Sequence, residues 1–221
     1  MKPTNHQAGG LRMPPRALRV AHPRVADIME EGYDLAPEIS RIYECLPLED
    51  QGQVGACAAY STCCSLQSRT WTIRGRPVDF AELPAYQWAM DNDGLDGDGT
   101  TVDAAIAACK ALGYCQDFSQ REVTLDAGFD EFKYALRLYG NVICGLEICS
   151  GWNNLNDRGV IPDGGKVLGG HAVLAVKYED FGPVFANSWG RKTWGINGFG
   201  QCSWAEFKRI FWVARAVEWT L

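Results

Sequence analysis

A cysteine at a predicted helix start constrains this chain more than any other feature. Cys57 lies in Gln51–Ser61 (QGQVGACAAYS), directly after a glycine-bounded turn, and Ala58–Trp71 contains no Pro or Gly, which is typical of a helix. The first N–H groups of a helix are unpaired, and the helix dipole puts about half a positive charge there. We therefore expect Cys57 to be a nucleophile with a lowered thiol pKa.

A thiolate nucleophile needs a base beside it, and one of the three histidines fits this role. His171 opens the apolar run of GGHAVLAVKYED, whereas the other two histidines lie in the Pro-rich first 24 residues. Asn187 follows 16 positions later, at the end of another short apolar run. An Asn at that point can accept a hydrogen bond from the imidazole, and Trp189 can keep water away from it.

Taken together, these residues resemble the papain-like cysteine peptidases. Three pieces match in chain order: QGxxGAC ending at Cys57, GGHAV around His171, and NSWG…WGxNGFG from Asn187 to Gly200. The resemblance spans about Leu46 to Trp212 and is closest to compact bacterial, archaeal or viral members. It implies a two-lobed α+β fold, with a helical lobe, an antiparallel β-sheet or barrel lobe, and the active-site cleft between them.

The resemblance also implies a role for each residue. Cys57 and His171 would form a thiolate–imidazolium pair that attacks a peptide carbonyl, and Asn187 would orient His171. The side chain of Gln51 would donate a hydrogen bond to the oxyanion. The substrate-binding residues that it implies are three glycines: Gly97, Gly99 and Gly170.

Three departures from the family pattern change details of the cleft. Val54 stands where the family has a cysteine, which removes a disulfide, and Ala58 replaces an aromatic residue of the cleft wall. His171 lies 114 positions after Cys57, against roughly 130 to 150 in the family pattern. We therefore expect trimmed surface loops in the second lobe and an intact Cys–His–Asn set.

The loop Asp91–Thr101 (DNDGLDGDGTT) combines four Asp with three Gly. Glycines permit unusual backbone angles and close approach by another chain, and the resemblance places this loop at the wall that pairs with a substrate backbone. The acidic residues, among them Asp96 and Asp98, favour basic peptides. The alternative is a solvated or cation-binding loop, although the spacing lacks the terminal Glu of an EF-hand.

A basic leader precedes an acidic body. Residues 1–24 contain five basic and no acidic residues, so the net charge of −6 leaves −11 for the remainder. This leader is either a disordered terminus or a short autoinhibitory segment that docks in the cleft of a peptidase domain at 25–221. Nucleic-acid binding is disfavoured, because the acidic body would repel phosphates. Within the domain, about 50–135 is expected to be mainly helical and about 136–221 mainly β.

Composition excludes several classes of protein. The 221 residues, 47% of them hydrophobic, suffice for one large core or two small ones, and no run of 18 apolar residues predicts a membrane span. The N-terminus lacks the apolar core of a secretory signal, so the chain is expected in the cytoplasm or exported by another route. Nine cysteines without a CxxC pair, beside three histidines, predict neither a zinc site nor a cofactor. The sequence does not decide whether cysteines such as Cys144 and Cys149 form a disulfide.

Periodicity predicts the remaining elements. Helices are expected at 58–71, 81–91, 101–112, 126–139 and from 203, and strands at 141–148, 171–178, 183–186, 198–202 and 211–219. Peptide-bond hydrolysis is the favoured function, with a peptide or protein as partner. Two alternatives stay open: an acyl transferase or transpeptidase using the same Cys–His pair, and a catalytically weak or inactive peptide-binding module.

Overall fold

The computed structural model describes residues 10–15, 19–30, 32, 33, 35, 45 and 47–221 of the chain. Within these residues the fold is α+β, as the sequence predicts. The helices are α1 (Cys57–Arg74), α2 (Glu82–Asn92), α3 (Val102–Ala111), α4 (Asp130–Tyr139) and α5 (Trp204–Ile210), with short 3-10 turns η2 (Val25–Ile28) and η4 (Ser150–Asn153). The strands are β1 (Asp117–Glu122), β2 (Val142–Cys149), β3 (Val167–Tyr178), β4 (Pro183–Ala186), β5 (Phe199–Gln201) and β6 (Phe211–Thr220).

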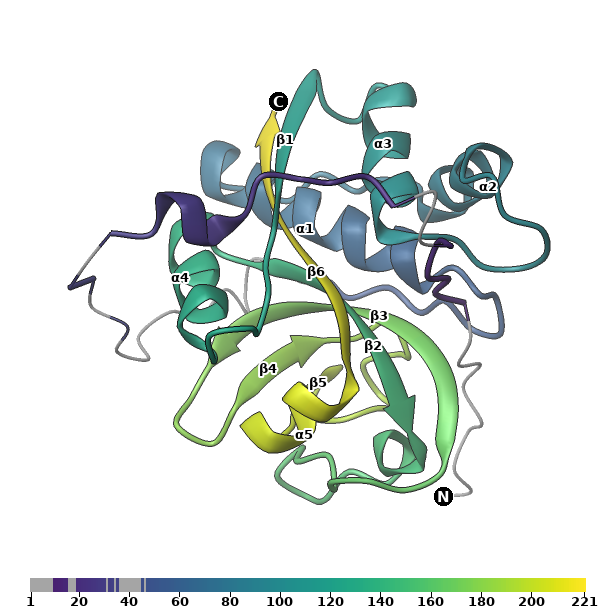
Figure 1. The fold of residues 1–221 in the computed structure, drawn as a ribbon. Coiled ribbons are helices and arrows are strands. Elements are labelled where there is room, and N and C mark those ends of the chain that lie inside the picture. The colour runs from purple at the N-terminus through teal and green to yellow at the C-terminus, as the bar shows by residue number, and fades with distance from the viewer. Residues whose placement is uncertain (1–9, 16–18, 31, 34, 36–44, 46) are drawn as a thin grey trace.

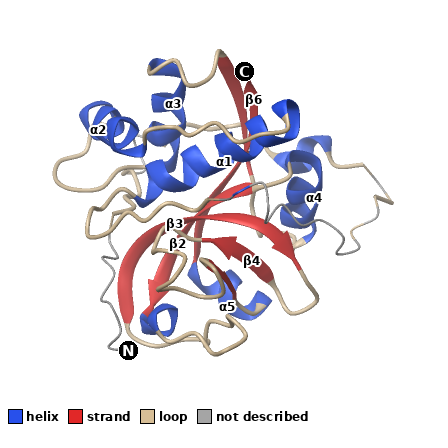
Figure 2. Cartoon of the chain, turned by 180° about the vertical axis from the view of Figure 1, so that it is seen from behind, coloured by secondary structure: helices blue, strands red, loops and turns tan. Residues whose placement is uncertain are grey.

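The strands form one antiparallel sheet in the order β1-β6-β2-β3-β4-β5. Helices α1, α2 and α3 gather in one half of the molecule, and β2 to β5 with α5 form the other half (Figure 1, Figure 2). Strand β6 crosses from the second half into the first, where β1 pairs with it. The two halves are therefore joined by a continuous sheet as well as by chain connections.

Two hydrophobic cores lie on opposite faces of this sheet. One lies between α1, α2, α3 and the sheet and contains Leu66 and Ile106. The other is enclosed by the sheet, α4 and α5 and contains Phe132, Phe207 and Trp152. Helix α1 packs directly against β3, so its first residue, Cys57, is fixed at the junction of the two halves.

Helix α1 is buried along most of its length, including polar positions. Ser65 is 1% exposed and donates a hydrogen bond to Asn141 Oδ1 over 2.7 Å, while its hydroxyl accepts from Trp219 Nε1 at 3.1 Å. Gly75, with φ of +66°, ends the helix in the left-handed conformation that glycine adopts readily. Because buried polar groups such as Ser65 are paired, α1 can sit inside the protein and hold Cys57 in place.

Two predicted helices begin later than the pattern indicated. Helix α4 starts at Asp130 and not at Asp126, because Gly128 has φ of +102° and cannot belong to a right-handed helix. In α3 the N-cap is Thr101 and not Thr100, and the Thr101 hydroxyl accepts from Ala104 N at 3.1 Å. Asp103, in the first turn of α3, accepts hydrogen bonds from Arg215.

Strand β1 was not predicted. Its sequence, DFSQRE, is polar, and its side chains are exposed or half-buried, so it lacks the apolar alternation that marks most strands. It forms because β6 offers it a full antiparallel register, from Asp117 opposite Thr220 to Glu122 opposite Arg215. The sequence also predicts an extended approach to the cleft from residue 34 to residue 49, and this stretch lies largely outside the described residues.

The described parts of the leader pack against the domain. Purple in Figure 1, they pass from beside α2 and α3 across β6 and β1 to α4. Leu11 forms a parallel bridge with Thr100, and Arg24 forms one with Glu122. Leu11 is 3% exposed and belongs to the core between α1 and the sheet.

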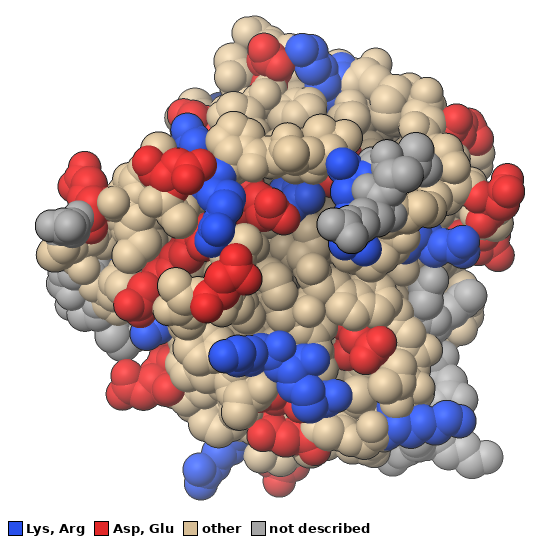
Figure 3. Space-filling view, viewed as in Figure 1, with Lys and Arg blue, Asp and Glu red and all other residues tan. Residues whose placement is uncertain are grey.

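The described residues contain no helix that is both long and apolar enough to cross a bilayer. All nine cysteines lie in the described residues and carry reduced thiols, Cys144 and Cys149 included. In the space-filling view, acidic side chains gather at the edge of the molecule formed by α2 and the loop after it (Figure 3). Lysine and arginine side chains are interspersed with acidic ones over the rest of this face.

Candidate active site

Cys57 is held at the start of α1 by a short turn. Val54 N donates to Gln51 O at 3.2 Å, and Gln51 N donates to Ser188 O at 2.9 Å, which ties the turn to the opposite half of the molecule. Ala56 is the N-cap and offers no side chain to the first turn of the helix. The thiol of Cys57 therefore lies at the open, positive end of the helix dipole.

His171 and Asn187 lie on neighbouring strands of the sheet. His171 is in β3 and Asn187 follows β4, and the register of Leu174 opposite Ala186 brings the two side chains together. His171 Nε2 lies 2.8 Å from Asn187 Oδ1, and both residues are buried. The ring is thereby oriented with Nε2 donating to the amide, so Nδ1 is the atom that can exchange a proton with another group.

The Cys57 thiol reaches the strand that carries His171. It forms a hydrogen-bond contact with the backbone of Ala172, the residue after His171. The start of α1 and the part of β3 that carries His171 thus lie together at the junction of the two halves.

Indole rings surround the histidine. The Trp189 ring lies 4.5 Å from the His171 ring at 34°, and the Trp152 ring lies 6.2 Å away at 77°. Trp194 stacks on Trp152 at 5.8 Å and donates from Nε1 to the Trp152 carbonyl at 2.7 Å. These rings exclude water from the bond between His171 and Asn187 and strengthen it. The sequence did not predict a role for Trp152 beside His171, and the glycine before it is its only local signal.

Gln51 is 3% exposed, and both ends of its side chain are engaged. Its Oε1 accepts from Ser188 Oγ at 2.5 Å, and its Nε2 donates to Val54 O at 2.7 Å. An amide nitrogen carries two hydrogens, so Val54 takes one and a second can serve an oxyanion. Ser188 orients this amide, a role that was not predicted.

The surroundings of Cys57 favour the neutral form of its thiol. Burial raises its pKa to about 11, against the smaller lowering effect of the backbone at Ala172, Ala58 and Cys57 itself. The expectation of a lowered thiol pKa is therefore wrong here, because Cys57 is 0% exposed. Desolvation disfavours a buried thiolate more than the helix end stabilises it.

Part of the leader lies beside the predicted substrate-binding glycines. We call Gly10–Arg12 the cleft segment. Thr100 N donates to Gly10 O at 2.9 Å, and Arg12 N donates to Thr100 O at 2.9 Å. On the other side, Leu11 N donates to Gly170 O at 3.4 Å. The segment thus pairs through its backbone with both walls.

Two of the three glycines, Gly99 and Gly170, leave no room for a side chain. A Cβ at Gly99 would overlap the Gly10 carbonyl, and a Cβ at Gly170 would lie 2.6 Å from Leu11 O. Gly97 is more open, with Arg12 Nη1 3.7 Å from its ideal Cβ position. Gly97, Gly99 and Gly170 therefore all border the same extended segment.

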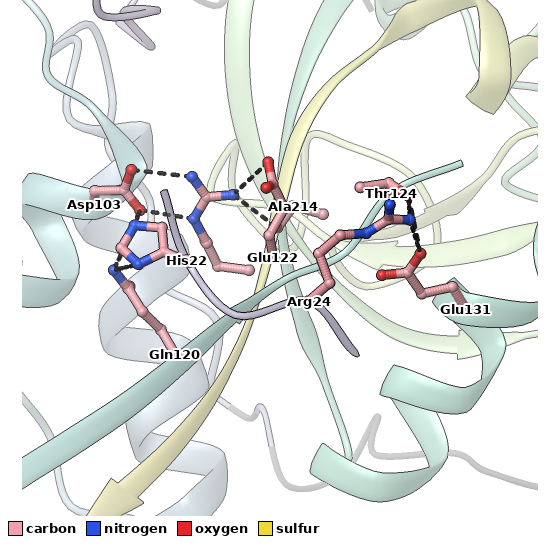
Figure 4. A network of polar contacts seen from close by, with 9 residues as sticks. His22, Arg24, Asp103, Gln120, Glu122, Thr124, Glu131 and Ala214 are labelled. Atoms are coloured by element: carbon pink, nitrogen blue, oxygen red, sulfur yellow. Dashed lines mark hydrogen bonds and ion pairs between the residues drawn. The ribbon is translucent and has the colours of Figure 1, made fainter. Parts of the chain in front are cut away.

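A second set of contacts holds the leader where it crosses β6, with His22 and Asp103 on one side of that strand and Arg24 and Glu131 on the other (Figure 4). We call His22–Asp27 the clasp segment. Arg24 Nη2 donates to Glu131 Oε2 at 2.9 Å and to Thr124 Oγ1 at 2.6 Å. His22 Nε2 lies 3.4 Å from Asp103 Oδ1. The hydrogen bond to Glu131, above all, raises the pKa of the Arg24 guanidinium.

Comparison with known proteins agrees with this geometry at the level of the fold. No protein-family model matches the sequence. Among solved structures, xylellain, a cysteine protease from Xylella fastidiosa, superposes with a TM-score of 0.69 at 17% identity, covering 99% of this chain and 98% of that one. The chain has the papain-like fold.

Other structures that share the papain-like fold are described as pro-forms. Procathepsin B S9 from Trypanosoma congolense has a TM-score of 0.73 at 16% identity, with 97% of this chain and 87% of that chain covered. The digestive procathepsin L 3 of the Tenebrio molitor larval midgut has a TM-score of 0.65 at 18% identity, with 98% and 76% covered. These likenesses extend over nearly the whole of this chain.

Proposed function

We propose that this protein is a cysteine peptidase that hydrolyses peptide bonds through an acyl-enzyme and is kept latent by its own leader. One observation carries the proposal: the thiol at the start of α1 contacts the backbone next to His171, whose Nε2 lies 2.8 Å from Asn187 Oδ1. A buried cysteine, an oriented imidazole and an orienting amide together form a nucleophile, a base and a positioning group.

The chemistry follows from which atoms are committed. Cys57 gives its proton to His171 Nδ1, because Nε2 is held by Asn187. The thiolate then attacks the peptide carbonyl and forms a C–S bond. Gln51 Nε2 and the Cys57 N–H donate to the oxyanion, and each such donor stabilises the transition state by on the order of 3 kcal/mol. His171 returns the proton to the leaving amine, and water hydrolyses the thioester.

The leader accounts for latency in two ways. Gly10–Arg12 takes up the hydrogen bonds at Thr100 and Gly170 that an extended substrate would need. The burial of Cys57 favours its neutral thiol, which is a weak nucleophile. The likeness to two proteins described as pro-forms supports this interpretation.

A matched pair of cysteine variants tests the proposal. In full-length protein carrying Gly10→Ala, which should displace the cleft segment, Cys57→Ala should lower peptide hydrolysis by at least roughly 1,000-fold. Cys64→Ala, in the same helix, should leave the rate within about twofold. Peptide binding without turnover in the parent variant would favour a binding module, and persistent hydrolysis in Cys57→Ala would overturn the assignment.

A further inference from the structure

The side chain of Arg12 occupies a defined binding site on the loop after α2. Its Nη2 donates to the carbonyl oxygen of Asp96 at 3.0 Å, and its Nη1 donates to the carbonyl oxygen of Asp98 at 3.1 Å. Gly97 and Gly99 have φ of +92° and +93°, a region that favours glycine. This backbone turns both carbonyl groups toward the same guanidinium.

The loop holds its shape through contacts that do not involve Arg12. Asp93 Oδ1 accepts from Leu95 N at 2.8 Å, and Asp93 Oδ2 accepts from Thr100 Oγ1 at 2.7 Å. The Tyr86 hydroxyl accepts from Gly99 N at 3.0 Å. Since these bonds lie within the domain, the two carbonyls should keep their positions when the leader moves away.

The two carbonyl oxygens that bind Arg12 favour a cation with several N–H groups. Carbonyl oxygens only accept hydrogen bonds, so an acidic or apolar side chain would leave both without a donor. A guanidinium presents parallel N–H groups that reach two oxygens at once, whereas an ammonium is a single point donor. The exposed carboxylates of Asp96 and Asp98 add a negative potential, which solvent and salt weaken.

An apolar site for the Leu11 side chain lies directly beside the site that binds the Arg12 guanidinium. The Leu11 side chain lies against β2 and β6, with Cδ2 2.6 Å from the ideal Cβ position of Gly145, a position that is itself 2.7 Å from Val213 Cγ1. Gly145 is therefore what makes room for a branched apolar side chain. The two consecutive residues Leu11 and Arg12 fill two neighbouring and chemically different sites.

We infer that the carbonyl oxygens of Asp96 and Asp98 form a subsite for an arginine side chain of a peptide substrate, an inference that rests on the proposed peptidase function. The apolar site beside Gly145 takes the neighbouring residue of that substrate. Arg12 and Leu11 occupy these subsites in the latent state. The acidic loop thus recognises a basic side chain chiefly through its backbone and only secondarily through its carboxylates.

Binding of matched peptides tests this inference without requiring turnover. Full-length Gly10→Ala/Cys57→Ala protein would be titrated with fluorescent peptides containing Arg beside Leu, in both sequence orders, and with the same peptides containing citrulline, the neutral isostere of Arg. The Arg peptide should bind about tenfold more tightly in at least one order, because citrulline loses the charge and a donor. Affinities within twofold in both orders would overturn the subsite.

Two loop variants separate carbonyl from carboxylate recognition. Asp93→Ala removes hydrogen bonds that hold the loop in shape. The ratio of the affinities for the Arg and citrulline peptides should then fall close to 1, with affinity for the citrulline peptide retained. Asp96→Asn/Asp98→Asn should change the ratio by less than about threefold, because exposed charges contribute little. The opposite result, loss of preference only in the double variant, would contradict recognition by the carbonyls. Absence of peptide hydrolysis by the Gly10→Ala protein with Cys57 intact would instead count against the proposed peptidase function, whatever these affinity ratios are.

Discussion

The leader makes two kinds of contact with the domain, and they differ in what they require of the sequence. The cleft segment, Gly10–Arg12, is held by backbone hydrogen bonds to Thr100 and Gly170, and its Arg12 side chain donates to backbone carbonyls. The clasp segment, His22–Asp27, is held by side-chain charges on Asp103 and Glu131. The first resembles the way an extended peptide would bind, and the second resembles an ordinary protein surface contact.

This difference separates two functions within one short peptide. The backbone pairing of the cleft segment tolerates many side chains, whereas the sites that hold Leu11 and Arg12 select an apolar and a cationic one. Charged contacts depend on particular residues and weaken with salt. We therefore expect changes in the cleft segment to alter access to Cys57, and changes in the clasp segment to alter stability.

The largest effect is expected from a single added methyl group. In Gly10→Ala the new Cβ would overlap the Gly55 carbonyl, which is backbone and cannot rotate away. Overpacking of this kind costs roughly 1 to 3 kcal/mol, so covalent labelling of Cys57 by a peptidyl chloromethyl ketone should be about 10- to 100-fold faster. Pro15→Ala, at an exposed position, is the control. An unchanged labelling rate in a folded Gly10→Ala protein would contradict occlusion by Gly10–Arg12.

The pH dependence of labelling should distinguish the covered from the uncovered thiol. Burial raises the pKa of Cys57 to about 11, so the protonated form is favoured and the thiolate fraction grows as pH rises toward that value. In the unmodified chain the labelling rate should rise about tenfold per pH unit from neutral pH upward. In Gly10→Ala the rise should occur at lower pH, because water reaches the thiol. Identical profiles would show that the leader does not control this pKa.

A smaller effect, on stability, is expected in the clasp segment. Arg24→Ala leaves the carboxylate of Glu131, which is 6% exposed, without its guanidinium. The free energy of unfolding should fall by about 1 to 2 kcal/mol, measured by urea denaturation. Arg24→Ala/Glu131→Gln should recover part of this loss, since no unpaired charge remains. Labelling of Cys57 should change less than about threefold; a change as large as that in Gly10→Ala would contradict the division between the two segments.

The smallest effect is expected at His22. Its contact with Asp103 is 3.4 Å long, and Asp103 already holds Arg215 through bonds of 2.8 and 3.1 Å. His22→Ala should therefore lower the free energy of unfolding by no more than about 0.5 kcal/mol at neutral pH. A loss larger than that of Arg24→Ala would show that the clasp is centred on His22.

The sequence predicted the elements whose residues carry local signals. Helix α1 follows from a run without Gly or Pro, and Cys57, His171 and Asn187 stand beside glycines or at the ends of apolar runs, where strands and helices begin or finish. Their meeting depends on the pairing of β3 with β4 and on α1 packing against β3. That tertiary step was available only through resemblance to a known family.

The parts that were missed depend on partners far along the chain. Strand β1 is polar and is defined by β6, almost one hundred residues later. The state of the Cys57 thiol depends on burial, which the helix start alone does not reveal. The Arg12 side chain binds backbone carbonyls, so the acidic side chains of the loop could predict a preference for basic peptides but not the atoms that would contact them.

Mapping of the labelled residue is the most direct test of the central claim, that Cys57 is a nucleophile covered by the leader. Full-length unmodified and Gly10→Ala proteins would be treated with a peptidyl chloromethyl ketone at neutral pH and analysed by intact mass and peptide mapping. We expect one adduct, on Cys57 alone among the nine cysteines, forming slowly in the unmodified chain and rapidly in Gly10→Ala. An adduct on another cysteine, or none on Cys57 in folded Gly10→Ala protein, would contradict the claim.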